Sequence, residues 1–248
     1  MIKRLTATFI AFSILFSLSI KANAEELTLS AKSAILINAH TNEVIYEKNA
    51  YEKRGMASTT KIMTALIAIE SGNLNKTVVA QAEDVRVEGT SIGLKEGDKI
   101  TLETLVCGML LESGNDAANV TARVIGKSKE KFVALMNQKA KEIGMEDTQF
   151  KNPSGLTEEG HFSTAYDMAR ITMSAIKTEG FNTYFGETKY EIPPTNKQEE
   201  TRYLRSSNDL LKGKYECEGI FMSKNGWTGE AKNTLITAAE RNGVTLIA

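Results

Sequence analysis

Strand-like patterns lie at both ends of the chain, and helix-like patterns lie between them. Residues 33–38 and 43–47 are apolar runs separated by a short polar stretch, which is typical of two strands joined by a turn. Residues 232–239 and 243–248 repeat this arrangement at the far end of the chain. Terminal strands around a helical middle favour one α+β domain, with a sheet that is completed by both ends of the chain.

Five segments in the middle of the chain have the periodicity or the composition of helices. In the first of them, Ile62, Leu66 and Ile69 recur at the intervals of one helical face. In the last, Thr164 and Asp167 have the spacing of a capping box. The predicted helices are residues 59–71, 102–112, 115–126, 128–143 and 163–178.

Residues 1–24 have the three parts of a secretory signal peptide. Two basic residues are followed by a mostly apolar stretch, residues 5–20, and by a small-x-small cleavage site at residues 22–24. An uncleaved membrane anchor is the alternative, but the apolar stretch is shorter than the ~20 residues that a span needs. We therefore expect export and a mature domain of residues 25–248. We also expect a longer natural protein, because the sequence stops inside an apolar strand pattern.

The composition argues against several classes of protein. The formal net charge is −1, and it falls to −4 without residues 1–24, which hold three basic and no acidic residues. The chain has no basic tract, so a nucleic-acid partner is not expected. Two histidines and two cysteines, with no Cys-x-x-Cys pair, predict no metal site. No histidine is an obvious member of a Ser-His-Asp triad, so a serine hydrolase built from this chain would need another base.

Cys107 and Cys217 leave two alternatives open. They could form one disulfide, or they could be two independent thiols. The second alternative is favoured because Cys107 lies in the apolar run of residues 105–111, where a small buried thiol packs well.

Ser58 and Lys61 form the first of three short motifs that carry chemistry. A serine and a lysine three residues apart lie on one helical face, so the amine can reach the hydroxyl. Serine is a weak nucleophile until a base removes its proton, and a lysine can be that base when burial lowers its pKa. The same spacing recurs from Ser128 and from Ser174, but only the Ser58 pair opens a helix in an apolar setting.

Ser113 and Asn115 form the second motif, which lies between two predicted helices. A hydroxyl and an amide at this position could face the nucleophile across a cleft. Ser113 could instead cap the helix of residues 115–126, or serve both purposes. The Ser-x-Asn pattern also begins at Ser71, but Ser71 lies about 20 Å along the same helix as Ser58 and is too far away.

The third motif consists of Lys224, Asn225, Gly226, Trp227 and Thr228, and it has the pattern of a strand end. Gly226 would let a ligand approach the backbone closely, and Lys224 would offer positive charge to a carboxylate. The alternative for Lys224 is an edge-strand lysine that deters aggregation.

In order and spacing, the three motifs resemble those of the serine D-alanyl-D-alanine carboxypeptidases, the low-molecular-mass penicillin-binding proteins of peptidase type S11. The resemblance covers about residues 28–248. It implies an antiparallel sheet flanked by helices, with a helical subdomain at roughly residues 75–160 beside the active site. Further segments that resemble the family are residues 93–98, 108–119, 152–156 and 163–167.

The resemblance also implies a mechanism. Ser58 would attack the carbonyl between the two terminal D-alanines of a peptidoglycan stem peptide, and Lys61 would accept its proton. Ser113, with Lys224, would pass a proton to the departing D-alanine, and water would release the acyl-enzyme. No metal or cofactor is implied. β-Lactams would act as inhibitors that acylate Ser58.

The substrate would be held by the remaining motif residues. Asn115 would bind the acyl-chain amide, and backbone N–H groups of Ser58 and Trp227 would form an oxyanion hole. The side chains of the third motif would surround the terminal carboxylate. The implied substrate-binding residues are Asn115, Lys224, Asn225, Gly226, Trp227 and Thr228.

Two features depart from the family pattern. Asn225 stands where the family usually has threonine, and we expect weaker handling of substrate or penicillin as a result. Many family members also carry a C-terminal β-rich domain and an amphipathic membrane anchor. Neither pattern occurs within these 248 residues, so membrane association would depend on a segment beyond Ala248.

Two other functions stay open. A β-lactamase would need a residue that activates the deacylating water. Glu158 and Glu159 lie in a suitable region, but a Glu-x-x-Leu-Asn pattern is absent. A non-catalytic wall-binding protein would keep the fold without turnover, and Asn225 is the feature that supports it.

Overall fold

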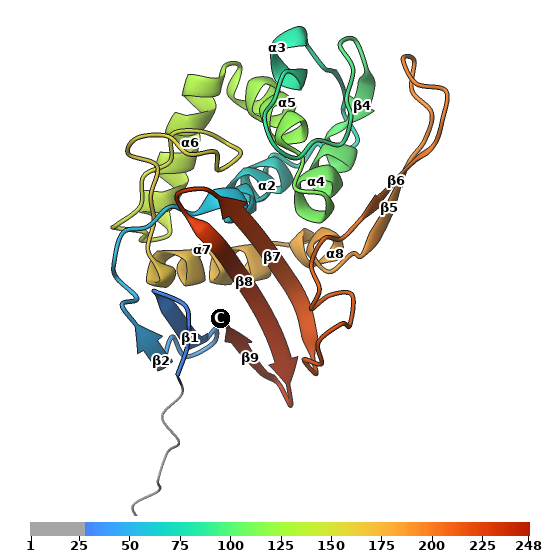
Figure 1. Ribbon diagram of the computed structural model, residues 1–248. Helices are drawn as coiled ribbons and strands as arrows, with labels where there is room; N and C mark the ends of the chain where they lie inside the picture. Colours follow the sequence, from blue (N-terminus) through green and yellow to red (C-terminus); the bar gives the residue numbers. More distant parts are fainter. Residues whose placement is uncertain (1–27) are drawn as a thin grey trace, which may run out of the picture. The chain divides into compact units, whose positions relative to one another are not determined.

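A five-stranded antiparallel sheet joins the two ends of the domain (Figure 1). The computed structural model describes residues 28–248, so the predicted signal peptide lies outside the described residues. The strand order places the first strand beside the last, with Ile37 opposite Ile247, which confirms the predicted closure of the sheet by both ends. In that order the strands are β2 (Val44–Lys48), β1 (Ala34–Asn38), β9 (Val244–Ile247), β8 (Lys232–Arg241) and β7 (Ile220–Thr228).

The helices predicted from the sequence are present, with ends within a few residues of the expected ones. Helix α7 packs against β1, β8 and β9, and α2 contacts each of α4, α5 and α6. The sheet with its flanking helices confirms the α+β fold. The helices are α2 (Lys61–Glu70), α4 (Leu102–Leu111), α5 (Asn115–Gly126), α6 (Lys129–Glu142) and α7 (Ala165–Lys177).

Helix α2 occupies the centre of the core. Every residue from Lys61 to Ile69 is buried, so this helix is enclosed on all sides and not only along one stripe. The 3₁₀ turn η1 (Ala57–Thr60) leads into it and contacts β7 and β8. The position of this turn places Ser58 between the helices and the edge of the sheet.

The capping box predicted at the start of α7 is only half present. The Thr164 hydroxyl accepts the N–H of Asp167 at 3.0 Å, as predicted. The Asp167 carboxylate does not return to Thr164. It accepts the Asp147 N–H at 2.9 Å and the Thr148 hydroxyl at 2.7 Å. A tertiary contact with a neighbouring loop has replaced the local one.

Several short elements carried no recognisable sequence signal. They have three to five residues each, too few to display a period. They form two small sheets and two short helices on the chain between the main elements. These elements are β3 (Thr77–Val79), α3 (Ala82–Val85), β4 (Lys99–Thr101), α8 (Phe181–Phe185), β5 (Lys189–Ile192) and β6 (Arg202–Arg205).

Residues 32–248 form one compact unit, and the helical subdomain at residues 75–160 stays a prediction. Both cysteines are free thiols, with Cys107 buried in α4 and Cys217 partly exposed. Within the part of the chain that the structure describes, no helix is both long and apolar enough to cross a membrane.

Candidate active site

Ser58 lies in the tight turn η1, one step before the central helix. It is half-buried, while its neighbours Ala57 and Thr59 are buried. Ala57 has a left-handed backbone, with φ of +47°, a conformation that is costly for a residue with a side chain. This turn explains why Ser58, unlike the next residues, keeps access to solvent.

The amine of Lys61 reaches the Ser58 hydroxyl, as the motif predicted. Its Nζ atom lies 3.0 Å from Ser58 Oγ, 2.7 Å from Asn115 Oδ1 and 2.7 Å from the Ser154 carbonyl oxygen. The side chain is fully buried. Burial holds the pKa of Lys61 well below its usual value, and the nearby charge of Lys224 lowers it further, whereas Asp116 opposes both effects. A neutral amine in this position can accept the serine proton.

A second buried lysine faces the second motif. Lys224 Nζ lies 3.1 Å from Ser113 Oγ and 2.8 Å from the Asn225 carbonyl oxygen. Burial lowers the pKa of Lys224 to about 7. Lys224 does lie on an edge strand of the main sheet, but its side chain is 1% exposed, so the alternative of a lysine that deters aggregation at that edge is wrong. The Ser113 hydroxyl does not cap α5, because Gly114 occupies the cap position and makes no side-chain bond.

Residues 88–94 hold the second motif in place from the other side. The Asn115 amide donates to the Glu88 carbonyl at 2.6 Å, and the Thr90 hydroxyl donates to the Ser113 carbonyl at 2.6 Å. The buried Asp116 carboxylate accepts the N–H groups of Ile92 and Leu94, each at 3.0 Å. Asn115 therefore touches Lys61 with its oxygen while its nitrogen is anchored.

The third motif lies on β7, an edge strand of the main sheet, directly beside Ser58. A Cβ atom on Gly226 would lie 2.6 Å from the Ser58 nitrogen, so a glycine is required at this contact. Trp227 is 66% exposed. Asn225 accepts a hydrogen bond from the Ser207 hydroxyl at 3.3 Å. The Thr228 hydroxyl accepts the Ala231 N–H at 3.0 Å, within the turn that follows.

The loop of residues 152–161 completes the site, and it received no role from the sequence. The Ser154 carbonyl accepts from Lys61, and the Pro153 carbonyl accepts from the Thr64 hydroxyl at 2.7 Å. Gly155 packs so tightly that a Cβ atom would lie 1.9 Å from the Ala57 carbonyl oxygen. The only signal for this loop was its resemblance to a family segment, because its contacts are made mainly by backbone atoms.

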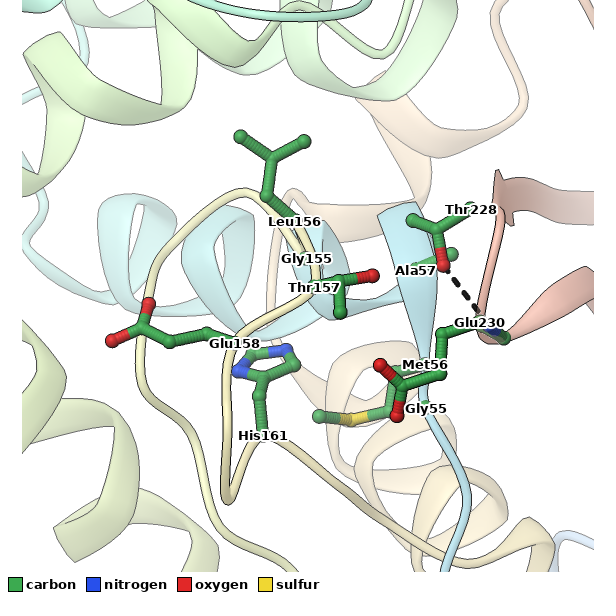
Figure 2. Close-up of a pocket in the computed structure, with 11 residues that line it drawn as sticks. Gly55, Met56, Ala57, Gly155, Leu156, Thr157, Glu158, His161, Thr228 and Glu230 are labelled. Carbon is green, nitrogen blue, oxygen red and sulfur yellow. Dashed lines mark hydrogen bonds between the residues drawn. The ribbon is translucent and has the colours of Figure 1, made fainter.

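A hollow opens beside η1, the turn that carries the candidate nucleophile Ser58 and is named the nucleophile turn (Figure 2). It lies between that turn, the loop of residues 152–161 and the turn after β7. In Figure 2 the Glu158 carboxylate points away from the other lining residues, and it accepts the Asn152 amide at 3.0 Å. The hollow is lined by Gly55, Met56, Ala57, Gly155, Leu156, Thr157, Glu158, His161, Thr228, Glu230 and Ala231.

The structure thus brings all three motifs together around one hydroxyl. The buried Lys61 amine contacts both Ser58 and Asn115, and the second buried lysine, Lys224, contacts the Ser113 hydroxyl. Burial lowers the pKa of both lysines, so Lys61 is more readily neutral than an exposed lysine, and Lys224, with a pKa of about 7, can hold or release a proton near neutral pH. Such a constellation suits acyl transfer through a serine.

Comparisons with known proteins agree with this geometry. A model of the D-alanyl-D-alanine carboxypeptidase family, peptidase family S11, matches residues 20–248. The chain is 37% identical over 260 residues to the D-alanyl-D-alanine carboxypeptidase DacF of Bacillus subtilis, covering 99% of this chain and 65% of that protein. It is 33% identical over 219 residues to DacB2 of Mycobacterium tuberculosis, covering 88% and 73%. The chain therefore spans only part of the length of these relatives.

Solved structures show the same fold. A D-alanyl-D-alanine carboxypeptidase from Mycobacterium tuberculosis superposes with a TM-score of 0.84 and 31% identity, covering 91% of this chain and 84% of that one. A mutant of the Streptomyces K15 DD-transpeptidase superposes with a TM-score of 0.83 and 31% identity, covering 90% of each chain. This protein belongs to the D-alanyl-D-alanine carboxypeptidase family, peptidase family S11.

Proposed function

We propose that this protein is a serine-type hydrolase that removes the terminal D-alanine from peptidoglycan stem peptides ending in D-Ala-D-Ala. The observation that carries the proposal is the 3.0 Å contact between the buried Lys61 amine and the Ser58 hydroxyl. Family membership and the names of the relatives support the substrate class. The action would take place outside the cytoplasm, where cell-wall peptides are found, and the signal-like pattern of residues 1–24 supports export.

Acylation would begin at Ser58. Lys61 would accept the hydroxyl proton as Oγ attacks the carbonyl carbon of the penultimate D-alanine. The negatively charged oxygen of the tetrahedral intermediate would accept hydrogen bonds from the backbone N–H groups of Ser58 and Trp227. The close contact of Gly226 with the Ser58 nitrogen supports this placement, because it brings the backbone of β7 against the nucleophile.

Departure of D-alanine requires a proton on its new amine. Ser113 would deliver that proton, and Lys224, 3.1 Å from the Ser113 hydroxyl, would resupply it. A substrate carboxylate near Lys224 would favour the charged form of this lysine. Asn225 and Thr228 would contribute further hydrogen bonds to the carboxylate, and Asn115 would bind the acyl-chain amide. Water would then hydrolyse the ester on Ser58.

The proposal is tested by incubating the protein with a fluorescent penicillin and with a peptide ending in D-Ala-D-Ala, alongside Ser58→Ala. We expect a covalent label and free D-alanine, both lost in the variant. A folded, untruncated protein that yields neither label nor D-alanine would overturn the proposal.

A second candidate is a penicillin- and wall-binding protein without turnover. Asn225 favours it, since an amide replaces the usual hydroxyl of the third motif. A penicillin label without release of D-alanine would support this candidate. A β-lactamase receives less support, because the Glu158 carboxylate accepts a hydrogen bond from Asn152 and points away from Ala57 and the other residues that line the hollow (Figure 2). Rapid loss of the penicillin label with hydrolysed penicillin in solution would revive that candidate.

A further inference from the structure

His161 is buried next to the nucleophile turn and has no role in the mechanism described above. It is 7% exposed, and both ring nitrogens have partners. Nδ1 lies 3.0 Å from the Lys151 backbone nitrogen, and Nε2 lies 2.9 Å from the Thr60 hydroxyl. A backbone N–H can only donate, so Nδ1 is the acceptor. The ring proton is therefore on Nε2, and Nε2 donates to Thr60.

Thr60 connects this histidine to the reacting groups. It stands between Ser58 and Lys61 in the first motif, and it is fully buried. A Cβ atom on Gly155 would lie 2.9 Å from the Thr60 hydroxyl oxygen and 1.9 Å from the Ala57 carbonyl oxygen. The loop and the nucleophile turn are thus in direct backbone contact, with the His161–Thr60 hydrogen bond beside it.

The same loop binds the base. Its Ser154 carbonyl lies 2.7 Å from Lys61 Nζ, and its Pro153 carbonyl lies 2.7 Å from the Thr64 hydroxyl. Displacement of the loop would remove an acceptor from Lys61. It would also open a path for water from the hollow to a lysine whose pKa is lowered mainly by burial.

His161 forms part of the wall of that hollow (Figure 2). Its ring packs edge-to-face with the ring of Phe150, with 6.0 Å between ring centroids. Glu158 and Glu230 are the charged residues that line the hollow with it. Burial lowers the pKa of His161 to about 4, so the ring stays neutral near pH 7 and keeps the tautomer that the Lys151 N–H selects.

We propose that His161 is a positioning residue. By its hydrogen bond to Thr60 it holds the loop of residues 152–156 against the nucleophile turn, and it thereby excludes water from Lys61 and keeps the amine aligned with Ser58. The proposal rests on the assignment of Ser58 and Lys61 as nucleophile and base. It adds a residue that touches neither substrate nor reacting atoms and acts through Thr60 and the Ser154 carbonyl.

The test measures, over a range of pH, the rate at which a fluorescent penicillin acylates Ser58 in the parent, in His161→Ala and in His161→Gln. His40→Ala is the matched control, because His40 is the other histidine of the chain and is exposed in a turn. We expect His161→Ala to acylate roughly 10- to 100-fold more slowly. We also expect the rising limb of its pH profile to move upward by roughly one pH unit, because water that reaches Lys61 weakens the effect of burial. His161→Gln keeps a donor for Thr60 and should recover much of the rate.

A second readout separates this proposal from the proposed function. The ¹³Cε chemical shift of Lys61, titrated against pH, reports the lysine pKa without any substrate. A raised Lys61 pKa in His161→Ala would support the positioning role even if the parent released no D-alanine. If His161→Ala does not fold, Thr60→Val removes the hydroxyl partner and should raise the Lys61 pKa in the same way. Folded variants that keep the parental acylation rate and the parental Lys61 titration would overturn the proposal.

Discussion

Lys61 Nζ lies 3.0 Å from Ser58 Oγ, and the same amine also donates to Asn115 and to the Ser154 carbonyl. Three oxygen partners hold the amine in one place, and complete burial disfavours its charge. The pair is therefore preorganised for proton transfer before any substrate arrives.

Removing the Lys61 amine should slow acylation strongly while leaving the fold intact. Lys61→Met keeps most of the side-chain volume and removes the amine, and we expect penicillin acylation to fall roughly 10²- to 10⁴-fold. In the parent, the rate should rise with pH and level off well below the usual pKa of lysine, because only the neutral amine accepts the proton and burial makes it neutral early. Stopped-flow labelling across pH measures both effects.

Lys131→Met is the matched control for this change. Lys131 belongs to another Ser-x-x-Lys pair, in which Ser128 caps α6 and the lysine is exposed. Parental acylation by this control is expected. An unchanged rate in Lys61→Met would remove the lysine from the mechanism.

Restoring threonine at the third motif should improve the reaction. In Asn225→Thr, a smaller hydroxyl replaces an amide whose oxygen is bonded to Ser207, and we expect a gain in kcat/KM of roughly 2- to 10-fold, the worth of one hydrogen bond. D-Alanine release from a D-Ala-D-Ala peptide measures it, with exposed Asn233→Thr on the neighbouring strand as control. A loss of activity in Asn225→Thr would instead mean that the site is adapted to asparagine.

Adding one methyl group at Gly155 should disturb both stability and acylation. The new Cβ atom would lie 1.9 Å from the Ala57 carbonyl oxygen, and φ is +89°. We expect Gly155→Ala to lower the free energy of unfolding by about 2 to 5 kcal/mol, from overpacking and from backbone strain. Urea denaturation measures the loss.

Gly213→Ala separates the two causes. Gly213 has a similar φ of +72° but nothing within 4 Å of its Cβ position, so only the strain of about 1 to 2 kcal/mol should remain. Equal losses in the two variants would show that the contact with Ala57 has no cost of its own.

Acid should destabilise the protein through His161. Burial lowers its folded-state pKa to about 4 from a usual 6.5, so the unfolded chain binds the proton more readily between these values. The contribution of His161 to stability is therefore complete above pH 6.5 and is lost as pH falls toward 4, by about 3 kcal/mol in all. Urea denaturation at several pH values should show this slope in the parent and in His40→Ala, but not in His161→Gln. A slope that persists in His161→Gln would assign the acid sensitivity to other groups.

Much of the site could be predicted because its chemistry lies in short, ordered motifs. Ser58 and Lys61 are linked by helical spacing alone, and the pairing of β1 with β9 follows from apolar runs at both ends. Helices α2 and α4 to α7 were predictable because each is long enough to show a period or a distinctive composition. Strands of three or four residues such as β3 and β4 were not, because so few positions carry no periodic signal.

The sequence by itself determined the fold class, the main helices, the family resemblance and the candidate reacting groups, since these depend on residue type and local spacing. Only the tertiary structure decided their environment. It buried Lys224, for which the sequence also allowed an edge-strand lysine that deters aggregation, and it paired the Ser113 hydroxyl with that lysine instead of with a helix end. It also placed the Ser154 carbonyl and Gly155 beside Lys61 and Ala57 through backbone contacts, and His161 beside Thr60 through its buried ring. Contacts of this kind join residues far apart in the chain, and their strength depends on burial, which no local pattern encodes.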